Sequence, residues 1–164
     1  MIRNKIAESG LVTLDLIDFY DTSPRKSIDL TNWLEDGLII KENSFKDRLR
    51  SIDHGSFKGV CVNIFCSTDV IIPTWAYMLI QAEIQSFAKE VFFGNRDALE
   101  LYLFQKKIHS VNFSKYKKKR VFVKSCKNKH LPVGAFSIIS TMLIPHVKSL
   151  FYGEPCSNVP LIKN

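Results

Sequence analysis

From residue 58 onward, apolar positions form short continuous runs and longer interrupted ones. Val60–Cys66 is a short run rich in β-branched residues, which is typical of a buried parallel strand. A polar turn follows, Pro73 suits a first helical residue, and Thr74–Lys89 is long enough for a crossover helix. Val91–Phe93 then predicts a second strand, which ends at a glycine. Residues 58–94 therefore predict one βαβ unit.

The same order of elements recurs in residues 120–153, again with a proline at the expected helix start and a glycine after the last strand. The separation from Pro73 to Gly94 is 21 positions, and the separation from Pro132 to Gly153 is also 21. Two ordinary βαβ units could look alike because they obey the same rules. The shared spacing favours an internal structural repeat.

We therefore predict an α/β fold: a doubly wound, mostly parallel sheet with helices on both faces, containing two βαβ repeats. Its 164 residues, 46% of them hydrophobic, suit a single globular domain. The N-terminal segment 1–57 precedes the repeats 58–94 and 120–153. Residues 154–164, with two prolines, should form an irregular tail or an edge segment. In a doubly wound sheet the first strands of the two repeats, Val60–Cys66 and Val121–Cys126, would be neighbours.

Three cysteines follow predicted strands at their carboxyl ends, where open parallel sheets bind ligands. Cys66 and Cys126 end the first strands of the two repeats, and Cys156 comes three residues after Gly153. Three thiolates on a stiff scaffold suit zinc, or iron in an iron–sulfur cluster. The predicted metal site is thus Cys66, Cys126 and Cys156 with Asp69; other candidate fourth ligands are His54, Glu154, Asp15, water or a substrate.

Two observations limit this metal hypothesis. The chain has no CxxC pair, which is the strong local signature of a metal–thiolate site. The three thiols could also be small apolar side chains packed at strand ends. Cys61 lies in the middle of a predicted strand, so we expect it to be an ordinary core residue.

Positive charge near Cys126 indicates a second chemistry, a cysteine persulfide or thiol carrier without metal. Lys127, Lys129 and His130 surround this cysteine ahead of a predicted helix. Nearby cations and a helix N-terminus stabilise a thiolate. Under this hypothesis Cys126 should be alkylated near neutral pH much faster than Cys61.

The formal net charge of +7 is partly concentrated in the run KYKKKR at residues 115–120. A short basic run is usually a solvated connector, and this one contains one aromatic residue, so nucleic-acid binding is not expected. A third hypothesis is a basic interaction module without chemistry, which binds an acidic partner through this run.

The chain contains no apolar run long enough for a membrane span and no apolar core of a secretory signal at its start. We therefore expect a cytoplasmic protein, whose cysteines are thiols or metal ligands rather than structural disulfides. The turns after Cys66 and Cys126 lack the glycines of a dinucleotide site or P-loop, and no HExxH motif is present.

Three segments, GLVTLDLIDFY, IFCSTDVIIPTWAYML and YGEPCSNVPL, resemble an uncharacterised bacterial family, domain of unknown function 2480. The resemblance covers nearly the whole chain, and Cys66, Cys126 and Cys156 fall in matching segments. No activity is assigned to the family. Its members are encoded close to iron–sulfur assembly proteins, so the resemblance implies a role near iron–sulfur biogenesis and such proteins as partners.

Overall fold

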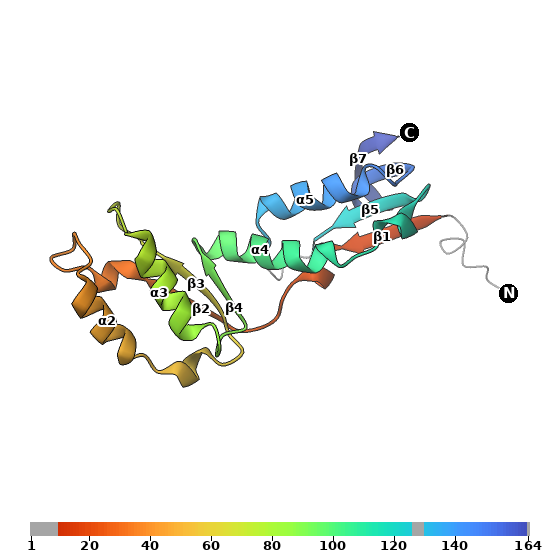
Figure 1. Cartoon of the computed structure of the whole chain (residues 1–164). Helices are drawn as coiled ribbons and strands as arrows, with labels where there is room; N and C mark the ends of the chain where they lie inside the picture. The colour runs from red at the N-terminus through yellow and green to blue at the C-terminus, as the bar shows by residue number, and fades with distance from the viewer. Residues whose placement is uncertain (1–9, 126–129, 164) are drawn as a thin grey trace. The chain divides into compact units, whose positions relative to one another are not determined.

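The fold consists of two compact units, each with its own sheet and core (Figure 1). A computed structural model describes residues 10–125 and 130–163. Unit 2 comprises Thr22–Leu99. Unit 1 comprises the described residues before and after that stretch. Because each unit has a hydrophobic cluster of its own, the two are described separately.

Unit 2 is a three-stranded parallel sheet with its helices in the connections. The strand order is β2-β3-β4, which follows the order in the chain. The strands are β2 (Arg25–Asp29), β3 (Cys61–Phe65) and β4 (Glu90–Phe93). The helices are α2 (Glu42–Arg50), α3 (Thr74–Ile84) and the short 3₁₀ helices η2 (Leu30–Trp33) and η3 (His54–Phe57).

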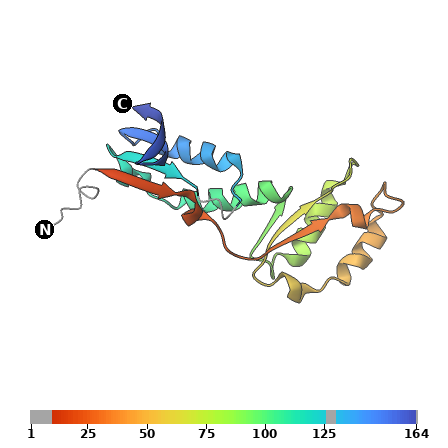
Figure 2. The same cartoon turned by 180° about the vertical axis from the view of Figure 1, so that it is seen from behind.

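Unit 1 has a four-stranded sheet in the order β1-β5-β6-β7, in which β7 is antiparallel to β6. Figure 2 shows this sheet from behind, with the red strand β1 beside β5. The strands are β1 (Leu11–Asp15), β5 (Arg120–Lys124), β6 (Ser149–Glu154) and β7 (Ser157–Lys163). The helices are α4 (Arg96–His109), whose first four residues belong to unit 2, α5 (Val133–Leu143), η1 (Leu16–Phe19) and η4 (Phe113–Tyr116).

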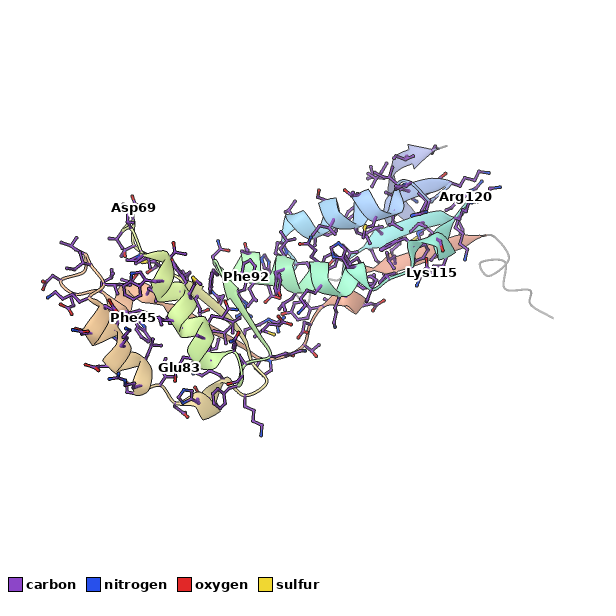
Figure 3. The ribbon with its side chains drawn as sticks, viewed as in Figure 1. Phe45, Asp69, Glu83, Phe92, Lys115 and Arg120 are labelled. Atoms are coloured by element: carbon purple, nitrogen blue, oxygen red, sulfur yellow. The ribbon has the colours of Figure 1, made fainter. Side chains whose placement is uncertain are left out.

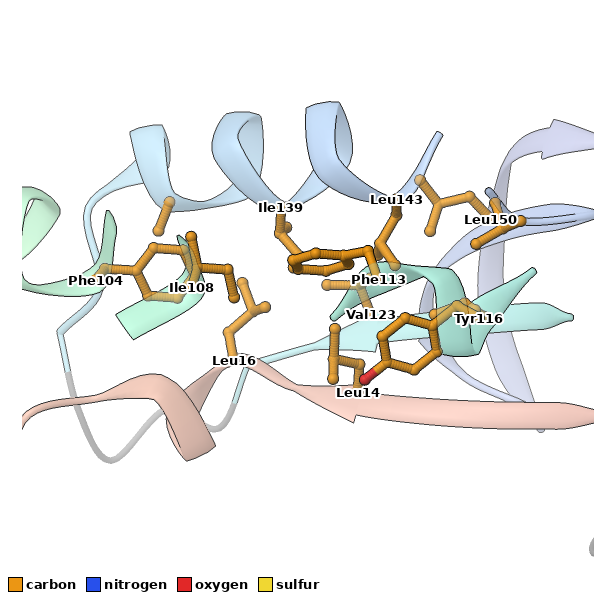
Figure 4. Close-up of a cluster of buried hydrophobic side chains, with 13 residues drawn as sticks. Leu14, Leu16, Phe104, Ile108, Phe113, Tyr116, Val123, Ile139, Leu143 and Leu150 are labelled. Carbon is orange, nitrogen blue, oxygen red and sulfur yellow. The ribbon is translucent and has the colours of Figure 1, made fainter. Parts of the chain in front are cut away.

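Alternating apolar side chains on the strands build the two cores. In unit 1, Leu14, Val123 and Leu150 pack in one cluster with Ile139 and Leu143 of α5 (Figure 4). The cluster of unit 2 likewise joins Ile28 of β2 and alternate residues of β3, Val62 and Ile64, to side chains of both α2 and α3. Because alternate residues of a strand share a face, the core helices of each unit cover one face of its sheet.

The predicted α/β class, with mostly parallel strands and helices packed against the sheets, is confirmed. The two predicted βαβ segments contain β3-α3-β4 and β5-α5-β6 in the expected order, each with parallel strands. The prediction that the first strands of these segments are neighbours is wrong, because β3 lies between β2 and β4 while β5 lies between β1 and β6. Each sheet instead takes a strand from the N-terminal segment.

Two further segments differ in detail from the sequence-based expectation. The strand β2 was not anticipated, because Ile28 is its only buried residue and the rest of the segment is polar. The C-terminal segment, expected to be irregular or an edge, forms the edge strand β7. Pro145 has no backbone N–H with which to continue a helix, and α5 ends at Leu143.

Candidate thiol site

The carboxyl ends of β2 and β3 bring two polar turns together in unit 2. Asp29, the last residue of β2, is paired with Phe65, the last residue of β3. The turn Leu30–Thr31 therefore begins beside the turn that starts at Cys66. Both turns lie at the edge of the sheet where ligands of parallel sheets usually bind.

Asp29 ties these two turns to each other. Its Oδ1 atom accepts hydrogen bonds from the backbone N–H of Thr31, at 3.0 Å, and of Ser67, at 3.1 Å. Burial raises the pKa of the Asp29 carboxyl, but the hydrogen bonds from Ser67 and Thr31 outweigh burial, so the pKa lies below its ordinary value. Asp29 is therefore held as a carboxylate that fixes both turns.

Two threonine hydroxyls surround the sulfur of Cys66. Oγ1 of Thr31 lies 3.5 Å from the sulfur, and Oγ1 of Thr68 lies 3.3 Å from it. Burial raises the pKa of the Cys66 thiol, and so does the charge of Asp29. Hydrogen bonds from both hydroxyls and from the Thr68 backbone N–H lower the pKa, and their effect is the larger one. The pKa of Cys66 is therefore below that of an ordinary thiol, which favours the reactive thiolate.

A largely apolar hollow of about 380 Å³ opens beside Cys66. Its lining residues are Ile64, Phe65, Cys66, Tyr77, Phe93, Gly94 and Asn95. Burial, followed by the negative charge of a Cys66 thiolate, raises the pKa of Tyr77, so its hydroxyl stays protonated. The half-buried thiol is thus accessible from a shaped surface rather than packed in the core.

Unit 1 lacks this arrangement at the corresponding positions. A shift of 59 positions, which takes Pro73 to Pro132, takes Cys66 to Ser125. Asp15 caps η1 in the same way as Asp29 caps η2. When these two caps are aligned, Thr31 corresponds to Ile17, whose side chain cannot donate a hydrogen bond. Among the residues that the structure describes, the threonine-bonded thiol is therefore a feature of unit 2.

The predicted metal ligands are distributed over different parts of the structure. Cys156 is exposed in the turn between β6 and β7 of unit 1, whereas Cys66 belongs to unit 2. Asp69 is exposed at the tip of the loop between β3 and α3 (Figure 3). Cys126 lies outside the described residues. Within residues 10–125 and 130–163, no three His, Cys, Asp or Glu side chains form a group that could hold a metal ion.

The other candidate fourth ligands have partners of their own. His54 Nε2 lies 2.7 Å from Glu83 Oε1, and its ring stacks on Phe87 with centroids 4.8 Å apart. Glu154 pairs with Lys124 at 2.8 Å. The Asp15 carboxylate accepts a hydrogen bond from the N–H of Ile17, so each of these side chains has a structural role.

Thr31 is the functional residue that sequence reasoning did not connect with the thiol. Asp29 caps the helical turn that follows β2, and its side chain accepts a hydrogen bond from the N–H of Thr31. The pairing of β2 with β3 was the missing step, because β2 was not recognised as a strand. Cys61 is fully buried, as expected for a core residue.

These features define a mixed α/β protein with a hydrogen-bonded thiol at the carboxyl edge of a parallel sheet. The chain belongs to the family described as "Protein of unknown function (DUF2480)", whose model matches residues 1–164. Comparisons with curated proteins and with solved structures found no match. Among the described residues, no helix combines the length and apolar character needed to cross a membrane.

Proposed function

We propose that the protein is a thiol carrier in which Cys66 accepts a sulfur atom as a persulfide and passes it to an acceptor. The observation that carries this proposal is the pair of threonine hydroxyls on the Cys66 sulfur, with the resulting lowering of its pKa. A carrier of this kind needs a thiolate that forms near neutral pH and is open to a partner. The hydrogen bonds favour the thiolate, and the open hollow gives a partner access to it.

The transfer step conserves atoms and electrons. The Cys66 thiolate attacks the terminal sulfur of a donor persulfide, and a new sulfur–sulfur bond forms at Cys66. The sulfur–sulfur bond of the donor breaks, and the donor leaves as a thiolate with the electron pair. No external oxidant or reductant is required, and the same step in reverse hands the sulfur to an acceptor thiolate.

This proposal moves the carrier chemistry from Cys126, where the sequence suggested it, to Cys66. We place the protein in the cytoplasm, where thiols remain reduced. Iron–sulfur assembly proteins, the partners suggested by the family resemblance, are natural recipients because their clusters are built with sulfur. The metal site of Cys66, Cys126, Cys156 and Asp69, with zinc or iron, stays a prediction.

Treatment with a low-molecular-weight persulfide tests the carrier function. Tryptic mapping by mass spectrometry should find one added sulfur atom on Cys66, before any appears on Cys61 or Cys156. The variant Cys66→Ser should lose the rapid phase of sulfur uptake. Uptake at the same rate in this variant would refute the assignment.

A hollow in unit 1 favours a second function, the binding of an acidic partner. Arg120, Lys148 and Lys163 line a space of about 420 Å³ together with Ser149 and Phe151. No carboxylate among the described residues pairs with these three cations. Arg120 is also the last residue of the run KYKKKR, which begins at Lys115, and both of these residues are labelled in unit 1 in Figure 3.

An oligoglutamate peptide tests this second function. Binding should weaken steeply with salt and should be lost in the variant Lys148→Glu/Lys163→Glu. The charge-matched control is Lys41→Glu/Lys58→Glu, which changes two exposed lysines of unit 2. Equal losses in both variants would indicate a non-specific effect of net charge and would exclude the hollow as the site.

A further inference from the structure

The hollow beside Cys66 has a counterpart in unit 1. The shift of 59 positions takes Ile64, Tyr77 and Phe93 to Val123, Phe136 and Tyr152, and these three side chains line a hollow of about 310 Å³. The aromatic pair is also preserved. Ring centroids of Tyr77 and Phe93 are 5.4 Å apart, and those of Phe136 and Tyr152 are 5.9 Å apart.

The backbone hydrogen bonds at the amino ends of the two βαβ segments that carry these hollows correspond as well. The N–H of Lys89 donates to the carbonyl of Val60 at 2.9 Å, and the N–H of Lys148 donates to Lys119 at 2.8 Å. The N–H of Gly59 donates to Phe87 at 3.2 Å, and Lys118 donates to His146 at 3.0 Å. Every one of these partners is related by the same shift of 59. The two hollows can therefore be compared position by position.

One lining residue of the unit 1 hollow has no counterpart in unit 2. Leu161 comes from β7, the strand that pairs with β6 in unit 1. The lining of the unit 2 hollow comes entirely from β3, α3 and the end of β4 with its flanking turns, and it includes the thiol. In unit 1 an extended segment of the chain thus places a leucine at the hollow, whereas no described residue of unit 2 adds such a segment to the corresponding hollow.

The loop and helix that flank the Cys66 hollow also expose large apolar side chains. Ile71 is 95% exposed and Met78 is 61% exposed. The shift of 59 places the polar residues His130 and Ser137 at these positions in unit 1. Exposed apolar side chains beside an apolar hollow are typical of surfaces that contact another protein.

We propose that the Cys66 hollow binds an apolar side chain from an extended segment of a partner protein, namely the protein that exchanges sulfur with Cys66. The model for this contact is Leu161, which lines the corresponding hollow of unit 1. This inference rests on the proposed carrier function and adds the kind of partner. The partner segment carries its reactive cysteine close to a leucine or a side chain of similar size. When the leucine enters the hollow, the reacting sulfur of the partner comes within reach of Cys66, which raises the rate of exchange.

Two synthetic hexapeptides test the inference directly. Both carry one cysteine as a mixed disulfide with thionitrobenzoate, and they differ only in having leucine or serine two residues from it. The Cys66 thiolate attacks the cysteine sulfur of the peptide, and thionitrobenzoate leaves with the electron pair and is measured by its absorbance. The protein carries Cys126→Ser and Cys156→Ser, so that its other thiol is the buried Cys61.

The leucine peptide should react about tenfold faster than the serine peptide and should show saturation. Equal rates for the two peptides would overturn the inference, and this comparison needs no substitution within the hollow. Phe93→Ala should abolish the preference, whereas Tyr152→Ala, the same change in the hollow of unit 1, should retain it. Loss of the preference in both variants would also refute the hollow as the binding site.

Alkylation by iodoacetamide separates this inference from the carrier function itself. The reagent is small and does not need the hollow. Rapid alkylation of Cys66 with equal peptide rates would refute the partner segment and leave the carrier function standing. In the wild-type protein, which retains Cys156, alkylation of Cys66 as slow as that of Cys156 would refute the carrier function.

Discussion

Oγ1 of Thr31 lies 3.5 Å from the sulfur of Cys66, although the two residues are 35 positions apart in the chain. Parallel pairing of β2 with β3 creates this contact, because it aligns Asp29 with Phe65 and so places the turns after both strands side by side. The hydroxyl can donate to the thiolate but gains less from the neutral thiol. The contact therefore links the sheet register to the reactivity of Cys66.

Thr31→Val should slow the alkylation of Cys66 by iodoacetamide at neutral pH. Valine has nearly the shape of threonine but no hydroxyl, so the pKa of Cys66 should rise and the thiolate fraction should fall. One unit of pKa corresponds to about a tenfold change in that fraction, and we expect a reduction of about threefold to tenfold. Thr141→Val, on the exposed face of α5, is the control and should leave the rate unchanged. An unchanged rate in Thr31→Val would mean that the hydroxyl does not stabilise the thiolate.

The alkylation rate of Cys66 should depend on pH with a midpoint below that of an ordinary thiol, because its pKa is lowered. Asp29→Asn should move this midpoint further down. The substitution removes a negative charge that raises the pKa of Cys66, while the amide oxygen can still accept the N–H groups of Thr31 and Ser67. Rate–pH profiles of both proteins, fitted for Cys66 by mass spectrometry, measure the shift. An upward shift would show that the geometry of the turns outweighs the charge of Asp29.

Gly153→Ala should destabilise the protein more than Gly94→Ala, although the glycines correspond in the two units. Both have positive φ angles, +109° and +147°, so alanine at either costs about 1–3 kcal/mol of backbone strain. A Cβ atom at Gly153 would lie 2.5 Å from the backbone oxygen of Ser157, which the β6–β7 ladder holds in place. At Gly94 the nearest atoms belong to the side chains of Ala98 and Phe92, at 3.1 Å, and these can shift.

Urea unfolding measures the difference, and we expect about 1 kcal/mol or more between the two variants. Gly10→Ala is the control for strain alone, since its φ is +65° and a Cβ atom there meets nothing within 4 Å. Equal midpoints for Gly153→Ala and Gly94→Ala would show that the β6–β7 turn adapts to the added methyl group.

Metal content distinguishes the carrier from the predicted metal–thiolate site. If the protein is a carrier, elemental analysis and a visible spectrum of protein purified without oxygen should show no stoichiometric zinc or iron. The metal hypothesis requires bound metal that is lost from Cys66→Ser and from Cys156→Ser and retained in Cys61→Ser. Stoichiometric metal with this dependence would replace the carrier as the function of Cys66.

Much of unit 2 could be predicted from local sequence. The apolar run before Cys66 forms β3, Pro73 stands immediately before α3, and Asp29 caps the turn after β2. These features depend on neighbouring residues, so a local pattern is enough to indicate them. The strand β2 was missed because its side chains are mostly polar, and its place is set by backbone pairing with β3 rather than by a hydrophobic pattern.

The sequence alone determined the α/β class, the two βαβ segments and the position of Cys66 after a buried strand, because hydrophobic periodicity and turn residues act over short distances. Only the tertiary structure decided that β3 and β5 belong to different sheets and that Thr31 faces Cys66. Strand order depends on which distant segments pair, and the backbone hydrogen bonds that join them are the same for every residue type except proline. The chemistry of the thiol follows from that pairing, since the groups that lower its pKa come from the turn after β2 and from the turn after β3.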